Sequence, residues 1–154
     1  MTFTEGNQIT LLRNGAEYFP ALESAIDAAN KEIHLQTYIY EADVVGLRIA
    51  DALKRAAQRG VQVCVLLDGF GCKDTPQPLL DDLRQSGVQV LKYRPKISPW
   101  AFKRSRLRRL HQKIAVVDGI IAFVSGINII DDMNTAALIP PRVDYAARDG
   151  VRGG

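Results

Sequence analysis

The sequence predicts an α/β fold, in which a mixed, mostly parallel sheet is flanked by helices (α/β/α). Apolar runs of strand length alternate with helical patterns along residues 9–93. The runs 33–40 and 61–67 are apolar on both faces, which is typical of strands buried inside such a sheet. Two further β-branched runs, 114–117 and 120–124, meet at an Asp-Gly pair and predict an added antiparallel hairpin.

One domain is expected over residues 1–154. A chain of 154 residues, 47% of them apolar, is long enough for one ordinary globular core but not for two. No apolar run reaches the roughly 18 residues of a membrane span, and the first residues do not resemble a secretory signal. Cys64, in an apolar run, and Cys72, in a Gly-containing loop, indicate reduced thiols in a cytosolic setting, and no Cys/His cluster indicates zinc.

The first half of the chain predicts two strands and two helices. Residues 9–12 are expected to form a short first strand, and Asn14 with Glu17 to cap a brief turn. A longer helix should then begin with Pro20 in its first turn and carry one apolar stripe. After the strand 33–40, Asp43 is a suitable N-cap for a second helix, whose inward face is formed by Leu47, Ala50, Leu53 and Ala57 and which should end at Gly60.

The second half predicts a strand, a helix, a strand and the hairpin. The strand 61–67 leads to Asp68-Gly69, residues 78–86 form a helix that ends at Gly87, and 88–93 form the next strand. A connection of about 15 residues, of a length common in functional loops, then leads into the hairpin. Residues 131–141 show no periodicity and predict an extended loop.

The hairpin gathers polar side chains at one end. Its turn is expected to be a tight two-residue turn at Asp118-Gly119. Because side chains alternate between the faces of a strand, His111 and Lys113 should point the same way. The returning strand should bring Ser125, Gly126 and Asn128 back towards them.

Basic residues are concentrated just before this hairpin, although the net charge is only +3. Residues 83–117 contain no acidic side chain and ten of the twenty basic ones: Arg84, Lys92, Arg94, Lys96, Lys103, Arg104, Arg106, Arg108, Arg109 and Lys113. The segment is either a solvated loop or a surface that faces an anion. Trp100 and Phe102 within it suit a membrane interface and also suit single-stranded nucleic acid, and charge alone does not separate the two.

The spacing of His111, Lys113 and Asp118 fits the pattern H-x-K-x4-D, with Asn128 downstream, and resembles the signature of the phospholipase D superfamily. Segments upstream resemble the amino-terminal half of bacterial cardiolipin synthases: Glu5-Gly6-Asn7, Leu12-Arg13-Asn14-Gly15, Tyr18-Phe19-Pro20-Ala21, Ala57-Gln58-Arg59-Gly60-Val61 and Leu66-Leu67-Asp68-Gly69. The resemblance covers residues 5–146. It implies a phospholipase D-like half with one such motif, incomplete at its C-terminus.

The residues of this motif suit attack on a phosphodiester. Neutral imidazole is a competent nucleophile near pH 7, and His111 is the candidate. Lys113 and Asn128 would hold the phosphate oxygens, by charge and by an amide donor. The resemblance implies a phosphohistidine intermediate, no metal, no cofactor and a second histidine, from a second motif, as general acid. Because this sequence holds one motif, either two chains form a homodimer or a second half follows in the same chain, and the isolated chain is expected to be inactive.

Each candidate residue also has a structural reading. Asp118 is catalytic in the resemblance, but an Asp-Gly turn favours it regardless of chemistry, and a supporting role is the stronger expectation. Ser125 and Gly126 occur in the reverse of the order common in the superfamily, which weakens their assignment to substrate binding. Asp144 corresponds to a carboxylate that would orient His111, or is a surface residue. Asp68, at the carboxyl end of a strand, is a weaker candidate, and His34 is expected to be a core or strand histidine.

The resemblance favours a phosphatidyltransferase of phospholipid synthesis. Its substrate would be an anionic phospholipid such as phosphatidylglycerol, and it would act as a peripheral protein at the cytoplasmic face of the bacterial membrane. The alternatives are a phosphodiesterase or nuclease with the same residues, and a non-catalytic fragment that binds anionic membranes. Nucleic acid is not the expected partner.

Overall fold

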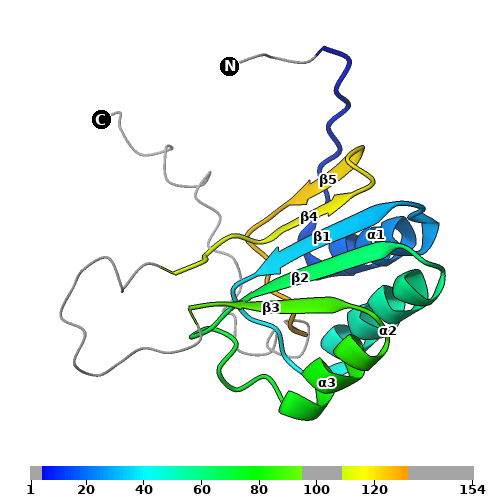
Figure 1. Ribbon diagram of the computed structural model, residues 1–154. Coiled ribbons are helices and arrows are strands. Elements are labelled where there is room, and N and C mark those ends of the chain that lie inside the picture. Colours follow the sequence, from blue (N-terminus) through cyan, green and yellow to red (C-terminus); the bar gives the residue numbers. More distant parts are fainter. Residues whose placement is uncertain (1–4, 95–108, 132–154) are drawn as a thin grey trace, which may run out of the picture.

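A computed structural model describes residues 5–94 and 109–131. This part of the chain forms three helices and five strands (Figure 1). In chain order they are α1 (Asn14–Ala28), β1 (Glu32–Thr37), α2 (Val44–Gln58), β2 (Gln62–Asp68), α3 (Gln77–Gln85), β3 (Gln89–Tyr93), β4 (Ile114–Val117) and β5 (Ile121–Val124). The predicted basic connection, with Trp100 and Phe102, and the loop after residue 131 lie outside the described residues.

The strands form one mixed sheet in the order β3-β2-β1-β4-β5. β1, β2 and β3 are parallel, whereas β4 runs antiparallel to β1, and β5 antiparallel to β4. The predicted mixed α/β sheet is therefore confirmed, with a parallel half and an antiparallel half. Because β4 is antiparallel to β1, its amino end lies at the same edge of the sheet as the carboxyl ends of β1, β2 and β3.

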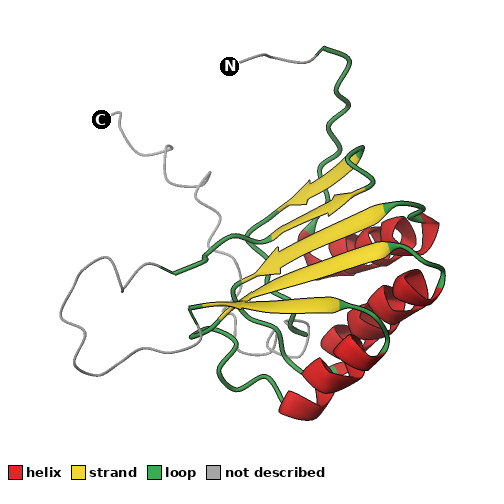
Figure 2. Cartoon of the chain, in the orientation of Figure 1, coloured by secondary structure: helices red, strands yellow, loops and turns green. Residues whose placement is uncertain are grey.

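The three helices lie on one side of the sheet (Figure 2). Two consecutive right-handed β-α-β crossovers that move in the same direction place α2 and α3 on the same face. The side chains that point towards the helices are buried, as in the row of Ile33, Val63 and Val117. His34 and Gln36 on the opposite face are more exposed. The composition of β1 predicted burial on both faces, but the strand is buried on one face only.

The N-terminal prediction was partly wrong. Residues 9–12 form no strand, and Ile9 is 94% exposed. Instead, α1 begins at Asn14, six residues before the expected Pro20, which lies inside the helix. The capping signal explains the early start, because Asn14 Oδ1 accepts the N–H of Ala16 and the Glu17 carboxylate accepts the N–H of Arg13 at 2.7 Å.

The strand predicted over 33–40 ends three residues early, at Thr37, and the elements after it match their predictions within one or two residues. Asp43 caps α2 by accepting the N–H of Gly46 at 2.8 Å, and Gly60, with φ 91°, follows the end of the helix. The inward face of α2 includes Ala50 and Leu53 as predicted, whereas Leu47 is 48% exposed.

The hairpin is confirmed, but its turn is one residue longer than expected. Asp118 and Gly119 have φ values of 54° and 68°, and the N–H of Ile120 donates to the carbonyl of Val117 at 3.0 Å. The strand pairing begins with Val117 opposite Ile121, so three residues separate β4 from β5.

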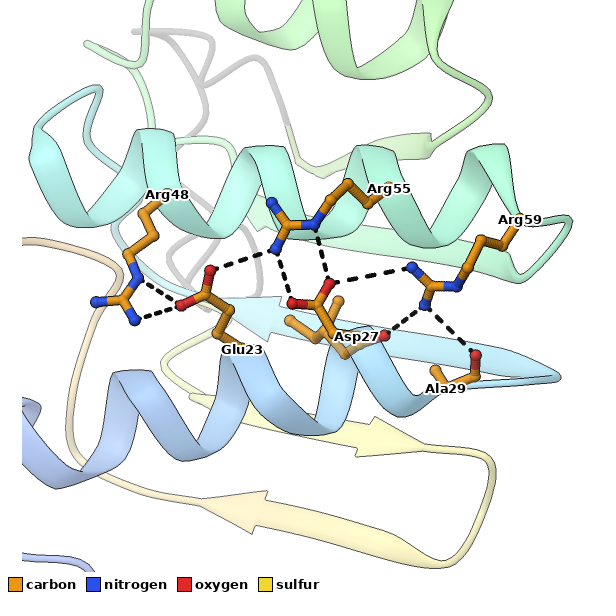
Figure 3. A network of polar contacts seen from close by, with 7 residues as sticks. Glu23, Asp27, Ala29, Arg48, Arg55 and Arg59 are labelled. Carbon is orange, nitrogen blue, oxygen red and sulfur yellow. Dashed lines mark hydrogen bonds and ion pairs between the residues drawn. The ribbon is translucent and has the colours of Figure 1, made fainter.

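An ion-pair network joins α1 to α2 along their exposed sides (Figure 3). Arg55 of α2 donates to both oxygens of Asp27 at 3.0 and 2.8 Å, and it also pairs with Glu23 at 3.3 Å. Arg48 pairs with Glu23 as well. Arg59 donates to the carbonyl of Ile26 at 3.0 Å, near the C-terminus of α1. These contacts fix the packing of the two helices behind the central strands.

Candidate active site

His111 and Lys113 lie just before β4 and point in the same direction, as strand alternation predicts. Lys113 Nζ lies 3.2 Å from His111 Nε2. An ammonium group can only donate, so Nε2 is the acceptor, and the neutral ring carries its hydrogen on Nδ1. The two candidates therefore form a direct contact at the edge of the sheet where the parallel strands end.

Tyr38, directly after β1, forms a platform for both side chains. Its ring centroid lies 4.8 Å from that of His111, with the planes inclined at 56°, and 5.3 Å from Lys113 Nζ. The sequence reasoning did not single out Tyr38. The available signal was its position, an aromatic residue at the carboxyl end of a parallel strand, where α/β proteins collect their ligands.

Lys113 is a buried cation with little electrostatic compensation. Its side chain is only 5% exposed, and burial lowers its pKa. In the described ranges no carboxylate forms an ion pair with it, and its polar partners there are His111 and the Tyr38 ring. His111, by contrast, is exposed. An anion can therefore reach the pair from solvent, and it would supply the negatively charged partner that Lys113 does not have in the described residues.

Asn128 is brought to the same end of β1. Its Oδ1 accepts the N–H of Ile39 at 3.2 Å. The following residue, Ile129, exchanges backbone hydrogen bonds with Ile39 and Glu41. The returning chain after β5 thus places Asn128 beside the residue that follows Tyr38, and its oxygen is engaged by the backbone.

Ser125 and Gly126 follow β5 directly, opposite the motif. The N–H of Ser125 donates to the carbonyl of Lys113 at 3.1 Å. The Ser125 hydroxyl accepts the N–H of Ile127 and is hydrogen-bonded to Tyr18, whose pKa is raised by burial. Gly126 is exposed, with open space where a side chain would be. The Ser125 hydroxyl therefore binds its own turn and α1.

Asp118 is not brought to the pair. It lies beyond the other end of β4, roughly 20 Å away at about 3.3 Å per residue. Its carboxylate accepts the N–H groups of Asn30, Lys31 and Glu32 at 2.9, 2.8 and 3.0 Å. These hydrogen bonds lower its pKa. In the structure Asp118 thus anchors the hairpin to the start of β1, away from His111 and Lys113.

Asp68 is the buried carboxylate of the site. It is 1% exposed and lies at the carboxyl end of β2. Its Oδ1 accepts the N–H groups of Phe70 and Gly71 at 2.9 and 3.0 Å, and its Oδ2 accepts that of Leu110 at 2.7 Å. Burial alone would raise the pKa of Asp68, but these hydrogen bonds and the nearby Arg109 outweigh it and leave the pKa lowered.

The two remaining candidates differ in what can be said of them. Asp144 lies outside the described residues. His34 is a strand histidine on the open face of the sheet, with its side chain 51% exposed and 3.2 Å from Glu32. It lies within β1, four residues before Tyr38, and serves as a reference for His111.

Cations and aromatic rings alternate along the same edge of the sheet. The guanidinium of Arg109 lies 4.7 Å from the Phe70 ring centroid, and Lys73 Nζ lies 5.7 Å from the same centroid. The guanidinium of Arg94 lies 5.3 Å from the ring centroid of Tyr93. The backbone carbonyl of Tyr93 accepts the N–H of Gly69. We call these five residues, Phe70, Lys73, Tyr93, Arg94 and Arg109, the cation–aromatic rim.

No group of three or more His, Cys, Asp or Glu side chains within 5–94 and 109–131 is placed to hold a metal ion. No helix there combines the length and apolarity that a membrane crossing requires.

The chain is similar to known proteins along most of its length. Residues 22–136 match the family described as "Cardiolipin synthase, PLD-like domain". The chain belongs to this family. It is 39% identical over 147 residues to cardiolipin synthase B of Shigella flexneri, covering 96% of this chain and 36% of that protein. It is 41% identical to cardiolipin synthase B of Salmonella typhimurium over 144 residues, and there it covers 94% of this chain and 35% of the relative.

More distant relatives and solved structures extend the comparison. Cardiolipin synthase 1 of Bacillus anthracis is 36% identical over 122 residues, 79% of this chain and 24% of that protein. The phospholipase D family member Nuc from Salmonella typhimurium matches with a TM-score of 0.56 at 22% identity, over 77% of this chain and 69% of Nuc. NucT from Helicobacter pylori gives a TM-score of 0.58 at 22% identity, over 73% and 67% of the two chains. These structures support the phospholipase D-like fold. The chain spans about a third of the length of the cardiolipin synthases B that it matches.

Proposed function

We propose that this chain supplies half of the active site of a cardiolipin synthase-type phosphatidyltransferase, with His111 as the nucleophile. The observation that carries the proposal is the contact between His111 and Lys113. An exposed imidazole Nε2 lies 3.2 Å from a buried ammonium that has no carboxylate partner in the described chain. This pair combines a neutral nucleophile with the charge that an anionic phosphodiester needs.

The reaction follows from the groups present. A non-bridging phosphate oxygen accepts an N–H from Lys113 in place of His111, which frees the Nε2 lone pair. Nε2 then attacks phosphorus, a P–N bond forms, and the bond to the leaving alcohol breaks. The alcohol takes a proton from a general acid. A second alcohol then gives its proton to the conjugate base of that acid and attacks the phosphohistidine, the P–N bond breaks, and the phosphatidyl group is transferred.

Asn128 is the proposed second contact to the phosphate. Because its Oδ1 accepts the N–H of Ile39, its side-chain NH₂ group is oriented by that bond and is the part that can donate to a phosphate oxygen. Tyr38 supports the arrangement, since an aromatic face stabilises the Lys113 ammonium without neutralising it.

A second motif is part of the proposal. The departing alcohol needs a general acid, and His34, the one other histidine, lies on the open face of β1 beside Glu32. We infer that the second histidine comes from the remainder of a longer chain or from a partner copy. The share of the relatives that this chain covers, about a third, supports a longer chain.

The proposed location is the membrane surface, with the protein peripheral at the cytoplasmic face. The cation–aromatic rim lies at the same edge as His111 and carries three cations and two rings. Aromatic rings suit the headgroup level of a bilayer, and basic residues are attracted to anionic lipid. Phosphatidylglycerol in such a surface is the proposed substrate.

A transfer assay tests the proposal. The domain, completed by its second half or as a dimer, is incubated with labelled phosphatidylglycerol in vesicles and separately with single-stranded DNA. We expect the wild type to form a lipid product and His111→Asn to form none. His34→Asn, which removes the exposed reference histidine, should still form the product. Cleavage of DNA without lipid transfer would favour a nuclease, and lipid transfer that survives His111→Asn would reject the nucleophile.

A further inference from the structure

The loop that follows β2 contacts the segment that carries His111. We propose that Asp68 is a positioning residue that holds His111 in place through the backbone of Leu110. The proposal rests on the proposed function, because it concerns the same nucleophile.

His111 lies outside the regular pairing of the sheet. The pairing of β4 with β1 starts at Ile114, three residues after His111. Immediately upstream of His111, the N–H of Leu110 donates a hydrogen bond to Asp68 Oδ2 at 2.7 Å. Downstream, the carbonyl of Lys113 accepts the N–H of Ser125. His111 is therefore held between two fixed points, and Asp68 supplies the first.

The contact requires a carboxylate. Asp68 uses Oδ1 for two N–H groups of its own loop and Oδ2 for Leu110. An asparagine has one acceptor oxygen and one NH₂ donor. It can satisfy either the loop or Leu110, but whichever side meets the NH₂ group faces donor against donor. At 1% exposure, water cannot easily replace the lost bond.

The same loop also fixes the platform beneath His111. A side chain at Gly71 would come within 2.1 Å of the Tyr38 carbonyl oxygen and 2.9 Å of its ring. Cys72 donates through Sγ to that carbonyl at 3.2 Å. The loop thus contacts the backbone of Tyr38, and the ring of Tyr38 packs on His111. The loop also contacts Leu110 directly. Both contacts bear on the orientation of the imidazole.

The orientation of His111 has a spectroscopic signature. In the arrangement described, Nε2 accepts from Lys113 and the ring hydrogen lies on Nδ1. Nitrogen-15 NMR of the 154-residue chain at a pH where both rings are neutral distinguishes the two tautomers of each histidine. We expect His111 to be mostly the Nδ1–H form in the wild type, whereas Asp68→Asn shifts it towards the mixture of a free imidazole. His34 is an internal reference and should not change.

Chemical phosphorylation provides a second readout. Potassium phosphoramidate transfers its phosphoryl group to imidazole nitrogen and releases ammonia, so no lipid and no second motif are required. We expect Asp68→Asn to slow phosphorylation of His111 by about tenfold, as a misplaced nucleophile would be, and to leave the rate at His34 unchanged. The control is Thr75→Val, which removes a buried hydrogen bond to the Tyr40 carbonyl from the same loop but does not touch Leu110.

Leu110→Pro removes the same hydrogen bond from the other side and leaves the acceptor contacts of the loop intact, which covers the case in which Asp68→Asn does not fold. Folded variants with the wild-type tautomer and rate at His111 would overturn the positioning role. So would equal effects in Thr75→Val. Neither readout involves lipid transfer, so failure of the transfer assay would leave this result standing, and the reverse also holds.

Discussion

Lys113 illustrates, at the scale of one residue, how a reactive site costs stability. Its ammonium is buried, its pKa is lowered by that burial, and its contacts in the described chain are an imidazole and an aromatic ring. Such a cation is poorly compensated until an anion binds. The same feature that prepares the site for phosphate therefore destabilises the empty fold.

Lys113→Met should stabilise the protein while it removes anion binding. We expect an increase of about 1 kcal/mol in the free energy of unfolding, measured with urea near neutral pH, because an apolar side chain needs no compensation there. A lowered folded pKa means that the unfolded chain binds the proton more tightly, so wild-type stability should rise with pH as Lys113 deprotonates. That rise should be smaller in Lys113→Met. A variant less stable than the wild type would contradict the account.

Asp118 should contribute to stability in a pH-dependent way. Its folded pKa lies below the ordinary 3.8 because three backbone N–H groups bind the charged form. The contribution is present above that ordinary value and is lost as the pH falls through the lowered one. Asp118→Asn should therefore have a lower urea midpoint than the wild type at pH 6, and the gap should close in acid. A constant gap would show that the charge is not involved.

The residue roles were only partly predictable from the sequence. The spacing of His111 and Lys113 predicted their shared direction, because strand alternation is local. Tyr38 and the role of Asp68 were not predicted, since both depend on contacts between segments 42 or more residues apart. For Asp118, turn chemistry and catalysis favour the same residue type, and only the fold separates them.

At the scale of elements, capping signals were more reliable than short apolar runs. Asp43 and Gly60 predicted both ends of α2. The apolar run 9–12 has strand composition, but it pairs with none of the described strands, and residues 9–11 are exposed. Whether such a run pairs is decided by tertiary packing, which its own residues do not encode.

The turn of the hairpin gives a prediction at this scale. Gly119 has φ 68°, in the left-handed region that side chains disfavour. Gly119→Ala should lower the free energy of unfolding by about 1 kcal/mol. Gly126, which has open space around it and no positive φ, is the matched control. Equal losses in the two variants would show that the turn conformation is not the cause.

The ion-pair network between α1 and α2 gives a second prediction at this scale. Asp27 and Arg55 form a bidentate pair, but their side chains are 40% and 45% exposed. We expect a coupling of about 0.5 kcal/mol from a double-mutant cycle of Asp27→Asn and Arg55→Gln, and a smaller value in 1 M salt. A coupling unaffected by salt would indicate packing of the side chains and not charge.

At the scale of the whole molecule, charge is unevenly distributed. The net charge is +3, yet half of the basic residues fall within 83–117, and the described ones include part of the cation–aromatic rim. The rim lies at the sheet edge that carries His111, so a membrane bound there would present its headgroups to His111, the proposed nucleophile. Sequence composition predicted the charge, but the pairing of Arg109 with Phe70 required the fold.

Vesicle binding tests this arrangement. Arg109→Gln and Phe70→Ala should each weaken binding to vesicles that contain phosphatidylglycerol by about fivefold, and added salt should reduce the effect of the first more than that of the second. Arg48→Gln, on the α1–α2 side, is the control with the same change in charge. Equal weakening by Arg48→Gln would indicate that net charge, and not the rim, governs binding.

The most direct test of the central claim is to identify the atom that receives phosphorus. The domain, completed by its second half, is mixed with phosphatidylglycerol, quenched within the turnover time and analysed by mass spectrometry under conditions that preserve P–N bonds. We predict a phosphatidyl adduct on Nε2 of His111. An adduct on another residue of this chain would contradict it. Product formation without any adduct would also contradict it, because the second alcohol would then attack the phosphodiester directly.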